Sequence, residues 1–156
     1  MSRDSELIET WSINNRILLY LLAEIDPAHL GDRTGGKGRS VGEQFAHVHN
    51  VRLMWLKSAG ADLLAGLEKL EKEAALDREL LGRSLEASGL AIAALLERAF
   101  AGDGRIKGFK PHAAAFLGYL ISHESHHRGQ LVVSLKLAGH PVSQKVAYGL
   151  WEWGVR

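Results

Sequence analysis

Apolar residues recur at helical spacing along most of this chain, and no segment alternates apolar and polar residues as a half-buried strand would. In the first segment the recurring positions lie three, four or seven residues apart: Leu7, Trp11, Leu18, Leu22 and Ile25. This spacing places them on one face of an amphipathic helix, which we expect to end near Pro27. A chain with this pattern has to bury its apolar faces by packing helices together.

The second helix has a clear start signal. Ser40 and Glu43 match the Ser-x-x-Glu capping box, so we expect a helix from about Ser40 to Ser58. The segment before it, residues 29–40, contains four glycines and is expected to be a loop. The spacing in residues 60–76 is less regular and predicts a connection with one or two helical turns.

The third and fourth helices are marked in the same way. Asp77 is an N-cap candidate for the third helix, which should end at the glycines of residues 101–109. Pro111 fits the first turn of the fourth helix, where an amide hydrogen would be unpaired anyway. Gly139, followed closely by a proline, is the stop signal of that helix.

Four amphipathic helices in 156 residues predict an all-α fold, a four-helix bundle formed by a single domain over residues 1–156. The core of such a bundle is also where metals are held between facing helices, and we expect a metal site there. The short C-terminal segment, residues 142–156, is rich in aromatic residues. We expect it to pack Tyr148, Trp151 and Trp153 on the end of the bundle.

The composition excludes several classes of function. The 19 basic and 18 acidic residues almost cancel and form no basic run, which argues against nucleic acid as a partner. The chain has no cysteine, so any metal must use nitrogen and oxygen ligands. No signal peptide and no run of ~18 uncharged apolar residues is present, which predicts a soluble, cytoplasmic protein without a membrane partner.

The segment HESHHRGQL, residues 123–131, lies inside the fourth predicted helix. His123 and His127 are four residues apart and share an apolar stripe with Leu120 and Leu131, so both should point into the core. Two imidazoles at this spacing can converge on one metal ion; the alternative is a hydrogen-bonded pair of structural histidines. His126 lies in a mixed polar row and is expected at the flank of the helix.

A third ligand is expected from the second helix, which offers His47 and His49. His49 shares the more apolar stripe with Phe45 and Leu56, so the pattern mildly favours His49 as the buried histidine. A lone buried histidine is more often a packed structural residue than a ligand, so the pattern leaves the choice open.

The same segment also matches H-E-x-x-H, the helical motif of zinc peptidases. The extended peptidase motif fails, because Gln130 and Val133 occupy its glycine and histidine positions. Glu124 is one residue beyond His123, so it is turned about 100° around the helix, away from a metal held by His123 and His127. We therefore expect Glu124 near the site or on the surface rather than as the base.

Two segments of the chain resemble the DinB-like (DinB/YfiT-like) family of four-helix-bundle metalloenzymes. The stretch SVGEQFAHVHNVRLMWL, residues 40–56, resembles the family's Ser-Val-x-x-x-x-Ala-His helix, and HESHHRGQL resembles its His-x-x-x-His-Arg-Gly-Gln signature. The resemblance implies that His47, His123 and His127 bind a divalent metal, nickel or zinc, and it is also compatible with a homodimer. It favours His47 over His49, which stays the backup.

The resemblance further implies chemistry with low-molecular-weight thiols such as mycothiol, bacillithiol or glutathione. The leading hypothesis is a metal-dependent enzyme acting on a small-molecule substrate, either a small-thiol-dependent S-transferase or a hydrolase. Arg128 is expected to bind an anionic substrate or thiol cofactor, or else to form a salt bridge between helices. Asn50 is a candidate for orienting a ligand. The alternative function is a non-catalytic bundle that binds a metal or a small ligand.

Overall fold

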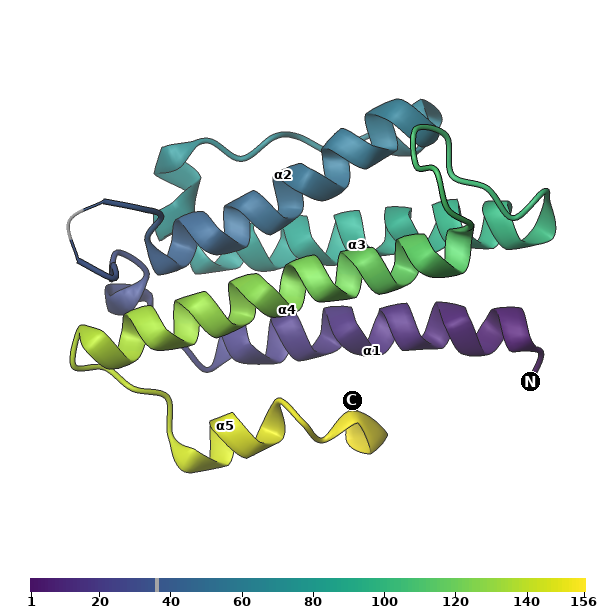
Figure 1. Ribbon diagram of the computed structural model, residues 1–156. Coiled ribbons are helices and arrows are strands. Elements are labelled where there is room, and N and C mark those ends of the chain that lie inside the picture. Colours follow the sequence, from purple (N-terminus) through teal and green to yellow (C-terminus); the bar gives the residue numbers. More distant parts are fainter. Residues whose placement is uncertain (36) are drawn as a thin grey trace.

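The computed structural model of the chain describes residues 1–35 and 37–156, which contain no strand. Its four long helices form the predicted bundle (Figure 1): α1 (Arg3–Ala23), α2 (Val41–Ala59), α3 (Arg78–Ala101) and α4 (Ala113–Leu137). Gly36, part of the loop predicted at 29–40, lies outside the described residues. None of the described helices combines the length and the apolar character that crossing a bilayer requires.

The helix starts follow the signals in the sequence. The Ser40 hydroxyl accepts a hydrogen bond from the Glu43 amide at 3.2 Å, and the Ser40 amide donates to the Glu43 carboxylate at 2.7 Å, which completes the predicted capping box of α2. Asp77 caps α3 by accepting from the Leu80 amide. These bonds satisfy amide groups that have no partner inside the helix.

Two helix boundaries differ from the prediction. α1 already ends at Ala23. Pro27 disfavours the helical conformation at the residue before it, Asp26, which is extended, and a separate 3-10 helix, Pro27–His29, begins at Pro27 itself. Pro111 lies just outside α4 rather than in its first turn. His112 takes the N-cap position, where its Nδ1 accepts from the Ala115 amide at 3.2 Å.

The connection between α2 and α3, residues 60–77, returns along the bundle before α3 begins, so that α2 and α3 run parallel (Figure 1). It contains two short 3-10 helices, Ala61–Leu64 and Lys72–Leu76, in agreement with the one or two turns predicted there. Asn50 of α2 attaches this connection through two hydrogen bonds, one in each direction, with the backbone of Leu70.

The C-terminal segment contradicts one prediction. α5 (Gln144–Gly149) and the 3-10 helix Trp153–Val155 lie along α1 instead of covering the end of the bundle (Figure 1). Tyr148 and Trp151 are exposed and Trp153 is half-buried, whereas Val146 is buried in one apolar cluster with leucines of α1. Gly149 lies so close to Tyr20 that a Cβ would meet its hydroxyl at 2.5 Å, and the Arg156 guanidinium lies 3.7 Å from the centroid of the same ring.

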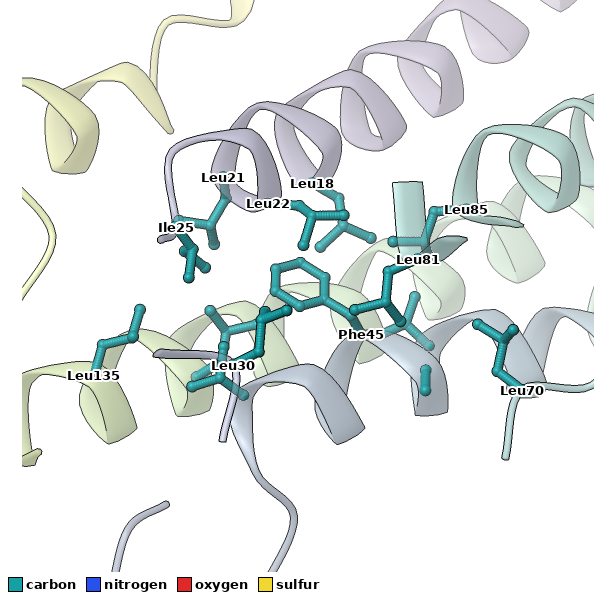
Figure 2. Close-up of a cluster of buried hydrophobic side chains, with 14 of the residues drawn as sticks. Leu18, Leu21, Leu22, Ile25, Leu30, Phe45, Leu70, Leu81, Leu85 and Leu135 are labelled. Carbon is teal, nitrogen blue, oxygen red and sulfur yellow. The ribbon is translucent and has the colours of Figure 1, made fainter. Parts of the chain in front are cut away.

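Two clusters of buried apolar side chains fill the two ends of the bundle. In the first, Phe45 of α2 lies between leucines of α1 and Leu81 of α3 (Figure 2). The second is built around Trp11, Leu96 and Phe116. Between the clusters lies a buried polar layer with one fully buried side chain from each long helix: Asn14, Arg52, Ser88 and Glu124. The histidine-rich segment of α4 adjoins this layer.

Candidate metal centre

Three histidines from two helices converge at the side of the polar layer. The ligand nitrogens of His47 on α2 and of His123 and His127 on α4 all lie within 4.8 Å of one another. The ring centroid of His47 lies 5.4 Å from that of His123 and 4.6 Å from that of His127. The centroids of the two α4 histidines lie 4.7 Å apart. The i, i+4 spacing on α4 places His123 and His127 on one face, as predicted, and α2 brings His47 opposite them.

Partial burial keeps these rings neutral. Desolvation, with smaller contributions from the Arg39 guanidinium and from His123, lowers the pKa of His47 from 6.5 to about 4. Desolvation, together with the neighbouring histidines, likewise lowers the pKa of His127 to about 4, and burial lowers that of His123 as well. All three imidazoles are therefore uncharged near neutral pH, which is the state in which a ring nitrogen can donate a lone pair to a metal.

Gln44 determines which nitrogen of His127 faces the site. Its amide oxygen lies 2.5 Å from His127 Nδ1, so Nδ1 carries the proton and Nε2 is left with the lone pair. The amide nitrogen of Gln44 donates to Gln130 on α4 at 3.3 Å, which fixes the orientation of the Gln44 side chain. Metal-binding histidines usually have such a partner on the second nitrogen.

The donor set fits a divalent metal. His123 Nδ1 is buried and has no hydrogen-bond partner among the described residues, whereas most buried ring nitrogens have one. Two ligand nitrogens of a tetrahedral zinc lie ~3.4 Å apart, since each is ~2.0–2.1 Å from the ion, so nitrogens within 4.8 Å of one another need to approach by roughly 1.4 Å at most. Three protein ligands are also the number found in open, catalytic zinc sites rather than in closed structural ones.

The other two histidine candidates lie elsewhere. His49 is 1% exposed, as its apolar stripe predicts, but its Nε2 lies 2.8 Å from the carbonyl oxygen of Glu68 in the connection between α2 and α3. It is therefore a structural residue on a different face of α2. His126 is exposed at the flank of α4, in agreement with the prediction.

Glu124 is not available as a base for the peptidase mechanism. It is fully buried and faces away from the histidine cluster: its Oε1 accepts from Arg52 Nε at 2.7 Å, and its Oε2 accepts from Arg52 at 2.9 Å and from Asn14 at 2.8 Å. Both oxygens are occupied by a bidentate guanidinium. Because Glu124 follows His123 by one residue, its side chain lies on a different side of α4 from the two histidines, as expected from the sequence.

The two histidine-containing segments also contain Arg128, Asn50 and Gly129, whose surroundings the structure shows. Arg128 is half-buried and donates to the side chain of Asn14 at 2.8 Å, a contact with α1 rather than a salt bridge. Asn50 engages both its amide nitrogen and its amide oxygen with the backbone of Leu70, so its observed role is to hold the connection between α2 and α3. Gly129, next to Arg128 on α4, is exposed, and a Cβ there would meet nothing within 4 Å, so no close helix contact depends on it.

Sequence reasoning missed three residues around the site: Gln44, Arg52 and Arg39. Arg52 had a recognisable signal, because it continues the buried stripe of Phe45, His49 and Leu56 at helical spacing and must therefore be paired inside the protein. Gln44 had no such signal, since its role depends on the position of His127 on another helix. Arg39 comes from the loop before α2 and is close enough to contribute to the lowered pKa of all three histidines.

Two cavities open beside the cluster. The first has a volume of about 400 Å³ and is lined by His47, by Arg39 and by the connection around Leu70 to Ala75. The second, of about 560 Å³, is lined by Gln44 and by the exposed side of α4 at His126 and Gln130, and it shares Arg39 with the first. Of the three candidate ligands, His47 thus lines a cavity large enough for a small molecule, and the second cavity lies beside Gln44, the partner of His127.

Comparison with known proteins agrees with this arrangement. A family model described as the DinB family matches residues 1–153. Neither the curated proteins nor the solved structures contain a significant match to the chain.

Proposed function

The chain belongs to the DinB family, and from this premise we propose that it is a metal-dependent enzyme, a small-thiol-dependent S-transferase or a hydrolase, with its site at His47, His123 and His127. The observation that carries the proposal is the set of three neutral histidine nitrogens within 4.8 Å of one another, with His47 in the wall of a cavity. Zinc or nickel suits these ligands, and the substrate is a small cytoplasmic molecule.

A divalent ion bound here would lower the pKa of a water or thiol and so supply a nucleophile near neutral pH. The protein needs no cysteine or serine of its own for such a reaction. The two histidine-containing segments resemble the DinB-like family, which includes enzymes that act through small thiols, and this supports the thiol form of the proposal.

The residues of the chain have separate tasks in this proposal. His47, His123 and His127 hold the ion. Gln44 keeps Nε2 of His127 directed at it by accepting a hydrogen bond from the Nδ1–H group of the same ring. Arg52, Glu124 and Asn14 form no part of the reaction; they hold α1, α2 and α4 in the register that brings the histidines together.

Elemental analysis tests the site directly. Protein purified without a histidine tag is expected to contain about one zinc or nickel ion per chain, and alanine at His47, His123 or His127 should abolish it. His126→Ala is the matched control on the same helix and should keep the ion, as should His49→Ala if circular dichroism shows that it folds.

Two outcomes would contradict the proposal. Equal loss of metal in His126→Ala and His127→Ala would disprove the assignment of the ligands. Absence of metal even after reconstitution with zinc and nickel would favour a bundle in which the three histidines are structural.

A further inference from the structure

The cavity beside His47 has an excess of positive charge. Four cationic side chains line it, Arg33, Arg39, Lys69 and Lys72, against the two carboxylates of Glu43 and Glu71. His47 itself adds no charge, because its ring is neutral. Two positive charges in the wall are therefore not balanced by the cavity's own carboxylates.

The ion pairs show which cations are engaged. Arg33 pairs with Glu43 at 3.0 Å, and that carboxylate also accepts from the Ser40 amide in the capping box. Lys69 pairs with Glu71 at 3.2 Å. Across residues 1–35 and 37–156, no carboxylate lies within ion-pair distance of Arg39 or Lys72.

Arg39 and Lys72 come from two segments that are far apart in the sequence. Arg39 precedes α2, whereas Lys72 begins the 3-10 helix Lys72–Leu76 that Asn50 and the close contact of Gly42 with Ala75 hold against α2. The fold therefore brings two cations without ion-pair partners to one cavity, and a candidate metal ligand forms another part of its wall. A concave wall of one sign concentrates the field on a bound anion.

We infer that this cavity is an anion subsite in which Arg39 and Lys72 bind an acidic group, such as a carboxylate, of the molecule that reacts at His47, His123 and His127. The inference rests on the proposed function and narrows it to acidic small molecules. Arg39 can hold a carboxylate through two parallel N–H groups, while Lys72 adds a second charge from the 3-10 helix Lys72–Leu76. Arg128, the anion-binding residue suggested by the sequence, instead contacts Asn14 and does not line this cavity.

Two thiols that differ by one carboxylate test the inference. Zinc-loaded protein is titrated by calorimetry, under anaerobic conditions, with N-acetyl-L-cysteine and with N-acetylcysteamine, which lacks the carboxylate. N-acetyl-L-cysteine is expected to bind about threefold to tenfold more tightly, the range of one charged contact in a partly exposed cavity. This preference should decrease with salt, because screening weakens exposed charge pairs.

The variants identify the residues responsible. Arg39→Gln and Lys72→Gln should each remove most of the preference and leave the affinity for N-acetylcysteamine and the zinc content unchanged. Lys57→Gln, which removes one positive charge from an exposed position in the last turn of α2, is the matched control and should change neither affinity. Equal affinities in the unmodified protein, or a preference that survives both cavity variants, would overturn the inference.

A second measurement separates this inference from the proposed function. If neither thiol binds the zinc-loaded protein, the thiol-dependent form of the proposed function fails, and the anion subsite is then tested without a thiol. Metal-free protein is titrated with succinate and followed by amide chemical shifts in NMR spectra. Binding that depends on Arg39 and Lys72 supports the subsite, and its absence overturns it.

Discussion

His47 and His49 are only two residues apart, yet they face different parts of the protein. The apolar stripe of α2 correctly identifies His49 as the more buried histidine, but burial does not decide which one can bind a metal. His49 contacts the carbonyl oxygen of Glu68, and His47 faces the two histidines of α4. At the scale of the residue, the direction of the side chain matters more than its exposure.

The same reasoning applies to Gln44, whose amide oxygen accepts a hydrogen bond from the Nδ1–H group of His127. Gln44→Leu removes this acceptor while keeping a similar side-chain volume, so the His127 ring is free to turn. We expect metal affinity to fall about 10–100-fold, as for other partners of metal-binding histidines. Competition with a chromophoric chelator measures the change.

Gln44→Glu is the informative control, because a carboxylate still accepts the Nδ1 proton and should largely preserve affinity. Gln130→Leu, which removes only the contact that orients Gln44, should have a smaller effect. If Gln44→Leu binds metal as tightly as the unmodified protein, the orientation of His127 does not depend on Gln44.

At the scale of the element, α2 is the helix that determines the site. Its capping box defines where the helix starts, and this start sets the positions of Gln44, His47 and Arg52 along it. Its first turn also approaches the 3-10 helix Lys72–Leu76 closely at Gly42, where a Cβ would lie 1.7 Å from the Ala75 carbonyl oxygen. This glycine is required by backbone contact rather than by its own conformation.

Gly42→Ala should therefore push the 3-10 helix Lys72–Leu76 away from α2. The expected cost is about 1–3 kcal/mol of the free energy of unfolding, typical of overpacking in a well-packed interior, and it is measured by urea denaturation. Faster hydrogen exchange in residues 72–76 should accompany it. Gly118→Ala on α4 is the control: a Cβ there meets nothing within 4 Å, so the helix should be unchanged or stabilised by up to ~1 kcal/mol. Equal stability of both variants would show that the contact at Gly42 relaxes at no cost.

At the scale of the whole molecule, the buried polar layer joins all four long helices. Arg52 of α2 donates to Glu124 of α4 and to the carbonyl oxygen of Leu85 on α3, and Asn14 of α1 donates to the same glutamate. All polar atoms of such a layer must be paired, because an unpaired charge in the interior is costly. These contacts therefore restrict how far each long helix can shift along its axis relative to the other three.

Replacing Glu124 by Gln leaves the Arg52 charge buried without a counter-charge. We expect a loss of about 3–5 kcal/mol in the free energy of unfolding, measured by urea denaturation. The double change Arg52→Met with Glu124→Leu removes both charges and should be less destabilising than Glu124→Gln alone. A single variant that loses less than ~1 kcal/mol would show that the pair does not hold the bundle together.

The sequence by itself determined the helices, because helix period, caps and stop signals are local. Leu7 to Ile25, the Ser40–Glu43 capping box and Gly139 could be interpreted without knowing what packs against them. His123 and His127 belong to the same class, since their shared face follows from a spacing of four residues. The resemblance of two short segments to a known family added His47.

Contacts between residues of different helices or segments were decided only by the tertiary structure. The pairing of Gln44 with His127, the Arg52–Glu124 ion pair and the cavity shared by Arg39 and Lys72 each join segments far apart in the chain. The packing of the C-terminal segment along α1 was decided in the same way, by Val146 in the apolar cluster and by Gly149 and Arg156 against Tyr20, rather than by the exposed Tyr148 and Trp151. Such contacts depend on the distances and angles between helices, and no local pattern of residues encodes these.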